Sequence, residues 1–302
     1  MTEYHNIPKV AILLATYNGD RWISEQISSI LNQTNVDLKV FVSDDLSTDA
    51  TLSIVNELAL SDTRVTILPK GKKFGSAGKN FYRLIEDVDF SEFDYVALAD
   101  QDDLWFKDKL SIGIKQLKAN HAEGYSSDVI AFWEDGKKLY VKKSYPQKSF
   151  DYLFESAGPG CTFILSKKLA KKVKLQLKKN KNQERSFFHH DWLIYAIARS
   201  VGMRWVIGNT PGMMYRQHGG NETGVNSGFS AILARIEKLR AGWYLNQVYH
   251  LAKIVKKADL LVCIIGKARH IPLKFPFYFM SSRRRLRDCI VLLILMILRI
   301  AK

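Results

Sequence analysis

The stretch DYVALADQDDLWFKD (residues 94–108) joins a short apolar run to a cluster of acidic residues. The run at residues 95–99 is typical of a buried strand, and it ends abruptly in Asp100, Asp102 and Asp103. Neighbouring carboxylates repel one another, because two unit charges ~4 Å apart interact with about 4 kcal/mol at an effective dielectric constant of ~20. Such a cluster at the end of a strand therefore indicates a site for a positive charge.

Short apolar runs alternate with amphipathic helical patterns through the first 120 residues. Strands are predicted over residues 10–15, 38–43, 65–68 and 95–99, and helices over residues 21–32, 48–60, 77–87 and 107–120. This alternation predicts a mostly parallel sheet with both faces covered by helices. Ligands bind beyond the C-terminal ends of the strands in such sheets, so Thr16, Asp44 and the acidic cluster are expected on one rim.

The pattern is less regular after residue 126. Strands are expected over residues 129–133 and 139–141, paired around the turn EDGK, and over residues 204–207 and 212–216. A glycine-rich turn, GPGC (158–161), precedes a strand-like segment. Helices are predicted over residues 167–181, which are basic, and over residues 191–201, opened by His190 and Asp191.

Positive charge is concentrated in the second half of the 302 residues. Residues 1–150 contain 18 Lys and Arg against 22 Asp and Glu, a net charge of −4, whereas residues 151–302 contain 27 against 8, a net charge of +19. The second half is therefore expected to meet an anionic partner, such as nucleic acid, phosphates or an anionic membrane surface. The three widely spaced cysteines and the absence of a signal peptide from MTEYHNIPK favour a reducing, cytosolic setting.

The chain ends in SSRRRLRDCIVLLILMILRIAK (281–302), a basic run followed by an apolar stretch. The apolar stretch at residues 289–298 is too short to span a membrane, which takes ~20 residues. A basic flank beside a compact apolar helix fits a monotopic membrane anchor. The alternative is a buried C-terminal helix beside a solvated arginine run. We expect a first domain over residues 1–225 and a helical, membrane-associating region over residues 226–302, so that deleting residues 283–302 releases the protein from membranes.

A hard divalent cation is the simplest stabiliser of the clustered carboxylates. Mg²⁺ or Mn²⁺ usually takes one or two carboxylates together with substrate phosphates. The alternative is an acidic cap on the helix near Lys107. Asp44 and Asp45 are suited to accept hydrogen bonds from a base or sugar, or to serve in turn and cap chemistry. The segment TYNGD (16–20) is not GxGxxG and no GxxxxGK[ST] occurs, so two common nucleotide-binding fingerprints are excluded.

Five motifs taken in order resemble family 2 glycosyltransferases with the GT-A fold. They are ATYNG (15–19), VSDDLSTD (42–49), ADQDDLW (99–105), HHDW (189–192) and YRQHGGN (215–221). ADQDDLW and YRQHGGN look most like bacterial rhamnosyltransferases that build polysaccharides such as O-antigen or capsule. The resemblance implies a nucleotide-sugar donor, either dTDP-rhamnose or a UDP-hexose, and inversion of the anomeric centre.

The resemblance also implies roles for individual residues. Asp191 matches the catalytic base, Asp102 a metal ligand, and His218 a residue that contacts metal or diphosphate. The residues implied to bind the nucleotide sugar are Thr16, Tyr17, Asn18, Asp44, Asp100, Gln101, Asp103 and Arg216. The loop beside the acceptor and donor sugar is implied to contain Trp105, Gly160, Cys161, Thr162, His190 and Trp192. The family usually has Glu where this chain has His190, which leaves the role of His190 open.

Other interpretations of these residues stay open at the level of sequence. His189, His190 and Asp191 could form a zinc-type cluster, although no further ligand has the right spacing. His218 could be a turn histidine, and Trp105 could serve packing rather than sugar binding.

The expected function is a metal-dependent inverting glycosyltransferase that uses Mn²⁺ or Mg²⁺. Its acceptor is expected to be a lipid-diphosphate-linked saccharide at the cytoplasmic face of the bacterial plasma membrane. One rival is a sugar-phosphate nucleotidylyltransferase, for which only Arg21 follows the first strand as a basic residue. The other rival is a nucleic-acid-binding protein, which is disfavoured because the acidic rim lies where a ligand should bind. The sequence predicts no oligomeric state.

Overall fold

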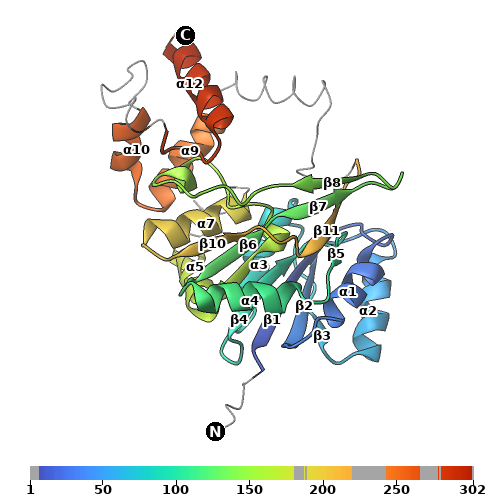
Figure 1. Cartoon of the computed structure of the whole chain (residues 1–302). Coiled ribbons are helices and arrows are strands. Elements are labelled where there is room, and N and C mark those ends of the chain that lie inside the picture. Colours follow the sequence, from blue (N-terminus) through green and yellow to red (C-terminus); the bar gives the residue numbers. More distant parts are fainter. Residues whose placement is uncertain are drawn as a thin grey trace.

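The central sheet has, within the described residues, seven strands in the order β10-β6-β9-β4-β1-β2-β3 (Figure 1). The computed structural model describes residues 7–179, 187, 189–219, 243–265, 278 and 280–300, with side chains up to residue 294 in the last segment. The strands are β1 (Lys9–Thr16), β2 (Asp37–Asp44), β3 (Val65–Ile67), β4 (Tyr95–Ala99), β6 (Gly124–Ser127), β9 (Ile164–Ser166) and β10 (Trp205–Gly208). All neighbouring strands are parallel except β9, which is antiparallel to β4 and β6. The predicted mostly parallel sheet is confirmed.

Two hydrophobic cores lie on the two faces of this sheet, because successive side chains of a strand point to opposite sides. The flanking helices are α1 (Ile23–Leu31), α2 (Thr51–Ser61), α3 (Ala77–Asp87), α4 (Lys109–Ala119), α5 (Lys167–Lys179) and α7 (His190–Ser200). On β1, Ile12 points into the core formed with α1, α2 and α4. Its neighbour Leu13 points into the core formed with α3, α5 and α7. The continuous apolar run of β1 is thus buried on both faces, as its sequence predicted.

A second, four-stranded sheet has the order β5-β11-β7-β8 within the same part of the chain. Its strands are β5 (Leu104–Trp105), β7 (Val129–Phe132), β8 (Lys138–Val141) and β11 (Met213–Arg216). The antiparallel pair β7 and β8 confirms the hairpin expected around EDGK. Strand β5 was not predicted, and it pairs Trp105 with Met213 of β11. This pairing places the motif ADQDDLW directly beside the motif YRQH.

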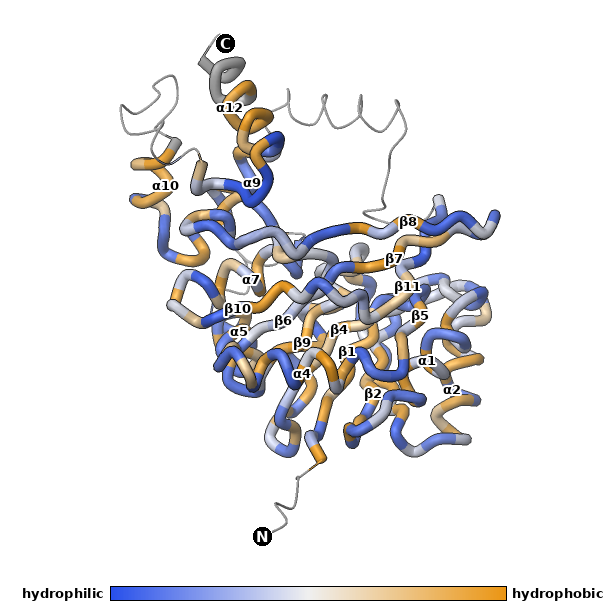
Figure 2. The backbone as a smooth tube through the Cα atoms, viewed as in Figure 1, coloured by the Kyte–Doolittle hydropathy of each residue, from blue (hydrophilic) through white to orange (hydrophobic). Residues whose placement is uncertain are grey.

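The C-terminal helices α9 (Trp243–Ile254), α10 (Ala258–Ile265) and α12 (Leu286–Ile300) lie beyond α7 (Figure 1). Val248 and Leu251 of α9 are fully buried in the core shared with α3, α5 and α7. The Tyr244 hydroxyl donates to the Phe154 carbonyl, 2.7 Å away, next to the short helix η1 (Asp151–Leu153). Apolar residues dominate α10 and α12 (Figure 2). No described helix is both long and apolar enough to cross a membrane.

The arginine run before α12 is partly buried, unlike the solvated run of the alternative interpretation. The side chain of Arg284 is 5% exposed, and its two guanidinium nitrogens lie 3.5 Å from Asp151 and 3.4 Å from Glu155. Arg283 also reaches Glu155, at 3.8 Å. The C-terminal region is therefore held to the rest of the described chain by ion pairs as well as by apolar contacts. The predicted boundary at residues 225 and 226 lies outside the described residues and stays a prediction.

Candidate active site

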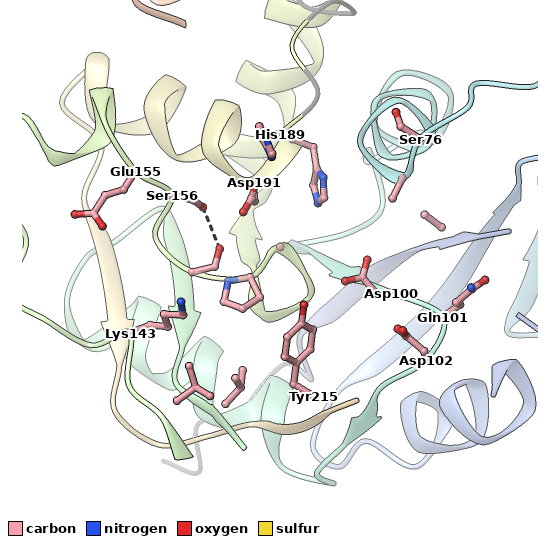
Figure 3. Close-up of a pocket in the computed structure, with 18 of the residues that line it drawn as sticks. Ser76, Asp100, Gln101, Asp102, Lys143, Glu155, Ser156, His189, Asp191 and Tyr215 are labelled. Carbon is pink, nitrogen blue, oxygen red and sulfur yellow. Dashed lines mark hydrogen bonds between the residues drawn. The ribbon is translucent and has the colours of Figure 1, made fainter. Parts of the chain in front are cut away.

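A cavity of about 1160 Å³ opens at the C-terminal ends of β1 and β4, where ligands bind in parallel sheets. Figure 3 shows the carboxylates of Asp100 and Asp191 pointing into this space, with Asp102 nearby. Of the predicted site residues, the cavity is lined by Thr16, Tyr17, Asp100, Gln101, Asp102, Gly160, His190, Asp191 and His218. The predicted base and the predicted metal ligand therefore share one cavity, although they lie far apart in the sequence.

Gln101 joins the loop after β1 to the loop after β4. Its Oε1 accepts hydrogen bonds from Thr16 Oγ1 at 2.6 Å and from Tyr17 N at 2.8 Å. Its Nε2 donates to the Tyr17 carbonyl at 3.0 Å. Gly19 leaves room for this side chain, because a Cβ at Gly19 would collide with it. In this structure Gln101 positions the rim, and its contact with a nucleotide sugar stays a prediction.

The carboxylate of Asp44 holds the turn that follows β2. It accepts hydrogen bonds from the Ser47 amide at 2.9 Å and from the Ser47 hydroxyl at 2.5 Å. Asn18, at a positive φ of 48°, donates its amide N–H to the same hydroxyl and accepts from Thr48 N at 2.8 Å. These contacts match the turn chemistry left open for Asp44. Its contact with a base and that of Asn18 with the nucleotide sugar stay predictions.

Asp45 received no separate role from the sequence, yet it lines the cavity. It is 3% exposed, and its carboxylate accepts hydrogen bonds from the amides of Phe74 and Gly75. Gly75 has a φ of 77°, a conformation that glycine adopts readily. Asp45 therefore fixes the loop that enters α3 at the edge of the cavity.

The three acids of ADQDD face different surroundings. Asp100 and Asp102 line the cavity, whereas Asp103 is 0% exposed. Asp102 Oδ2 lies 2.7 Å from His218 Nε2. Asp103 accepts a hydrogen bond from Arg216 N at 3.1 Å. Burial, and then the negative charges of Asp102 and Asp100, raise the pKa of Asp103 well above its usual range.

Arg216 supports the acidic loop from behind. Its Nε donates to the Asp102 carbonyl at 2.7 Å, and its guanidinium pairs with Glu25 at 2.6 Å. Two residues further along the motif, His218 stacks on Trp22 with the ring centroids 4.1 Å apart. Direct phosphate binding by Arg216 stays a prediction, since its observed contacts position the backbone of the acidic loop.

Trp105 lies inside the domain, 5% exposed, and packs on a buried lysine that the sequence did not single out. Lys109 Nζ lies 3.1 Å from the centroid of the Trp105 ring and donates to the Cys161 carbonyl at 2.7 Å. Burial lowers the pKa of Lys109 to about 7. The structure thus places Trp105 in packing, the alternative left open above. Lys109 stands out only because the structure buries it, and the amphipathic pattern of α4 does not predict that burial.

The glycine-rich turn (158–161) borders the cavity at Gly160, and the side chains that follow are buried. Gly160 lines the cavity, whereas Cys161 and Thr162 are 0% exposed in the helical turn η2 (Gly160–Thr162). The Thr162 hydroxyl donates to the Pro159 carbonyl at 2.7 Å. Cys161 and Thr162 were expected beside the sugars, and the structure instead places their side chains within the domain.

Helix α7 presents Asp191 to the cavity from its first turn. The preceding His190 stacks on Phe81 with centroids 4.2 Å apart and fits against Gly160, where a Cβ would collide with the imidazole. Burial lowers the pKa of His190 to about 4, so its imidazole is neutral at pH 7. Trp192 is 6% exposed and donates Nε1–H to the Tyr152 carbonyl at 2.9 Å. Trp192 anchors the helix in the core and does not line the cavity, and its predicted place beside the sugars stays a prediction.

The described residues offer one buried group of possible metal ligands and one pair on the cavity surface. Among the described residues, ligand atoms of Asp100, Asp103 and Cys161 lie within 4.8 Å of one another. Burial raises the pKa of the Cys161 thiol well above its usual range, and a neutral thiol suits a hard cation poorly. Asp102 and His218 offer a carboxylate and an imidazole on the cavity surface, which suit Mn²⁺ and, through the carboxylate, Mg²⁺. By its donor types, the surface pair Asp102 and His218 therefore suits a divalent cation.

Residues 11–190 match the family model described as glycosyl transferase family 2. The chain belongs to this family. It is 43% identical to the dTDP-rhamnosyl transferase RfbG of Shigella flexneri over 288 residues, which cover 95% of this chain and 100% of that protein. It is 32% identical over 163 residues to the Escherichia coli enzyme WfgD, a UDP-Glc:alpha-D-GlcNAc-diphosphoundecaprenol beta-1,3-glucosyltransferase; the match covers 53% of this chain and 61% of WfgD. The predicted family and rhamnosyltransferase-like subgroup are confirmed, and both rival classes are set aside.

Solved glycosyltransferase structures share the fold of the chain. The crystal structure of Staphylococcus aureus TarS 1–349 in complex with UDP-GlcNAc matches with a TM-score of 0.54 and 15% identity, covering 93% of this chain and 77% of that one. The complex of the same fragment with UDP also gives a TM-score of 0.54, at 17% identity, covering 93% and 76%. The expected GT-A fold is confirmed.

Several residues that line the cavity of this glycosyltransferase were missed from the sequence. They are Lys73, Ser76, Lys143, Glu155, Ser156, Tyr215, Arg283, Arg284, Arg285 and Arg287. Tyr215 is the first residue of the motif YRQHGGN, so its place in that motif could have predicted that it lines the site. The arginines were interpreted as a membrane flank or as a solvated run, because sequence alone does not show that the run returns to the cavity.

Proposed function

We propose that this glycosyltransferase transfers rhamnose from dTDP-rhamnose, with inversion, to a saccharide linked to a lipid diphosphate. The observation that carries the proposal is the single cavity that Asp191 shares with Asp102 and His218. The donor is supported by the full-length match to a dTDP-rhamnosyl transferase. The acceptor class is supported by the name of the Escherichia coli relative, whose acceptor is a diphosphoundecaprenol-linked sugar. A UDP-hexose is the alternative donor.

In the proposed reaction, Asp191 accepts the proton of the acceptor hydroxyl as this oxygen attacks the anomeric carbon. The dTDP group leaves from the opposite face, which inverts the anomeric centre. When bound, a divalent cation held by Asp102 and His218 would stabilise the charge that develops on the leaving diphosphate. His190 is neutral above about pH 4 and so adds no charge beside the base.

The proposal includes association with the cytoplasmic face of the bacterial plasma membrane through the C-terminal region. Leu286, Ile290 and Ile294 are 57%, 45% and 50% exposed. Their four-residue spacing puts them along one face of α12, and we call them the apolar stripe. A basic run followed by such a face is typical of helices that lie in the membrane interface.

Binding and transfer assays on the full chain test the proposal. With Mn²⁺ or Mg²⁺ present, dTDP-rhamnose is expected to raise the melting temperature more than UDP-glucose does. Asp191→Asn and Asp102→Asn are each expected to lower the transfer rate by about 100-fold or more while the protein stays folded. Glu57→Gln, an exposed charge removal on α2, is the matched control and should keep the wild-type rate.

Each part of the proposal can fail separately. Near-normal transfer by either variant would contradict the role of that residue. A larger stabilisation by UDP-glucose would assign the alternative donor, and transfer unaffected by EDTA would exclude the cation.

A further inference from the structure

The two ends of the active-site cavity carry opposite charge. Asp45, Asp100 and Asp102 line one end. The other end is lined by six cations, of which Arg283 and Arg284 pair with Glu155. The remaining four are called the basic cluster: Lys142, Lys143, Arg285 and Arg287. Figure 3 shows Lys143 and Asp100 on opposite sides of Asp191. The proposed base therefore lies between an acidic and a basic half of one cavity.

A buried carboxylate holds the chain segment that carries two of these cations. Asp128 is 0% exposed, and it accepts hydrogen bonds from the amides of Lys143 and Ser144. The Ser144 and Tyr140 hydroxyls donate to its other oxygen. Four hydrogen bonds to one carboxylate fix the backbone after β8, so the basic cluster rests on a built framework rather than a loose surface loop.

Tyr145 brings cations from two distant segments together. The Lys142 ammonium and the Arg285 guanidinium each lie 5.2 Å from the centroid of the Tyr145 ring. Burial, followed by the positive charges of Arg284 and Arg285, lowers the pKa of Lys143. The arginines of the C-terminal run therefore lie close enough to Lys143 to act on its charge.

The nearby acids offset only part of this charge. Asp288 lies 3.2 Å from Arg287 and 3.9 Å from Arg285. The other acid near the run, Glu155, is already paired with Arg283 and Arg284. The buried Asp128 already accepts four hydrogen bonds, so Asp288 and the proposed base Asp191 are the remaining acids near the basic cluster. Four cations outnumber these two acids, and the site complements the charge of a diphosphate.

We propose that the basic cluster binds the diphosphate of the lipid-linked acceptor, with the hydrocarbon chain leaving along the apolar stripe. The stripe begins at Leu286, directly after Arg285, so an anionic head and an apolar chain meet adjacent matching surfaces. Because the donor diphosphate is assigned to the acidic half with its cation, the two diphosphates flank Asp191. The acceptor hydroxyl then lies between them. This inference rests on the proposed function and specifies its acceptor site.

Calorimetric titration of the full chain, with the donor site saturated by dTDP and Mg²⁺, tests the proposal. The probes are farnesyl diphosphate, inorganic diphosphate and farnesol. Farnesyl diphosphate is expected to bind the wild type more tightly than either of the others. The variant K142Q/R285Q should bind it about tenfold to 100-fold more weakly, and K142E/R285E more weakly still. The matched control K138Q/R204Q removes the same charges from two exposed residues and should bind like the wild type.

The outcomes separate the diphosphate site from the donor reaction. Unchanged farnesyl diphosphate binding by K142Q/R285Q would overturn the proposal, as would no binding by the wild type. Equal binding of inorganic and farnesyl diphosphate would overturn the contact with the apolar stripe. Farnesol binding as tightly as farnesyl diphosphate would overturn the role of the basic cluster. A wild type that is not stabilised by dTDP-rhamnose contradicts the proposed function instead, and that measurement needs no acceptor.

Discussion

Asp102 and Asp103 are adjacent in the chain, yet only Asp102 faces the cavity. Asp103 points inward and accepts a hydrogen bond from the Arg216 amide. An asparagine at residue 103 can keep that acceptor, whereas an asparagine at residue 102 removes a charge from the cavity wall. The two isosteric substitutions should therefore have different effects on transfer.

We expect Asp103→Asn to keep the transfer rate within about threefold of the wild type, because an amide oxygen can replace the carboxylate as acceptor. Asp102→Asn should lower the rate by about 100-fold or more. Initial rates with dTDP-rhamnose, measured on both variants side by side, check this contrast. Equal losses in the two variants would show that the buried acid takes part in the reaction.

His190 should make folding stability depend on pH. Its pKa is about 4 in the folded chain and about 6.5 when unfolded, so the unfolded chain binds a proton first as the pH falls. The free energy of unfolding therefore keeps its full value with respect to His190 above pH 6.5. It falls by up to about 3 kcal/mol as the pH drops from 6.5 to 4. Urea unfolding at several pH values should show this loss in the wild type and not in His190→Gln.

The difference in free energy of unfolding between the wild type and His190→Gln at each pH isolates His190, because all other groups titrate in both proteins. His121→Asn removes an exposed histidine and should retain the wild-type pH profile. Parallel profiles for the wild type and His190→Gln would mean that His190 titrates normally in the folded chain.

The residues easiest to predict were those that stand together in the sequence. Asp100 and Asp102 form a cluster directly after an apolar strand, and that arrangement alone indicated a cation site. Lys109 and Trp192 could not be placed in the same way, because their roles depend on what surrounds them after folding. A lysine on a helix is usually solvated, and nothing local to Lys109 shows that α4 buries it.

Helix α12 combines a buried side with an exposed apolar one. Cys289 and Leu292 are each 1% exposed, while Ile290 and Ile294 are about half exposed. We expect I290Q/I294Q to weaken binding to vesicles containing anionic lipid roughly tenfold or more, since two half-exposed apolar side chains no longer enter the interface. Co-sedimentation of the full chain with such vesicles measures this.

The control for α12 is a pair of exposed leucines on other helices. L60Q/L175Q removes side chains that are 88% and 57% exposed, and it should co-sediment like the wild type. If I290Q/I294Q also binds vesicles like the wild type, the apolar stripe does not contact lipid.

Among the elements, those with a clear apolar pattern were predicted, including short strands such as β3 and β11, whereas β5 and β6 were missed. The long apolar strand β1 and the amphipathic helix α3 follow from their residue patterns. Strand β5 has two residues and β6 reads GYSS, so neither carries a pattern that a sequence can reveal. Both form because neighbouring strands offer them hydrogen-bonding partners.

Across the whole molecule, Arg284 links the C-terminal region to a buried carboxylate. Asp151 is 0% exposed and pairs with Arg284 at 3.5 Å and with Arg199 at 3.3 Å. Arg284→Met should lower the free energy of unfolding by about 3 kcal/mol, because it leaves buried carboxylates with fewer partners. Arg287→Met, at a side chain 71% exposed, should change it by less than about 0.5 kcal/mol. Urea unfolding of both variants is the measurement.

Equal stability of Arg284→Met and the wild type would show that the ion pairs contribute little. The same contacts change what a deletion of residues 283–302 can report, because it would remove Arg283 and Arg284 along with α12. Loss of membrane binding in that deletion would be accompanied by instability, whereas point variants on the apolar stripe keep the ion pairs.

The ion pairs of the arginine run also limit how freely the C-terminal region can be exchanged between relatives. Arg284 belongs to the last segment of the chain, but Asp151 and Glu155 belong to the loop that leads to the cavity. In a chimaera joined near residue 225, the C-terminal region of one relative would have to pair with Asp151 and Glu155 of another. Grafts that carry Asp151, Glu155 and the arginines as one unit should fold, so these enzymes are modular only when the exchanged module is discontinuous in sequence.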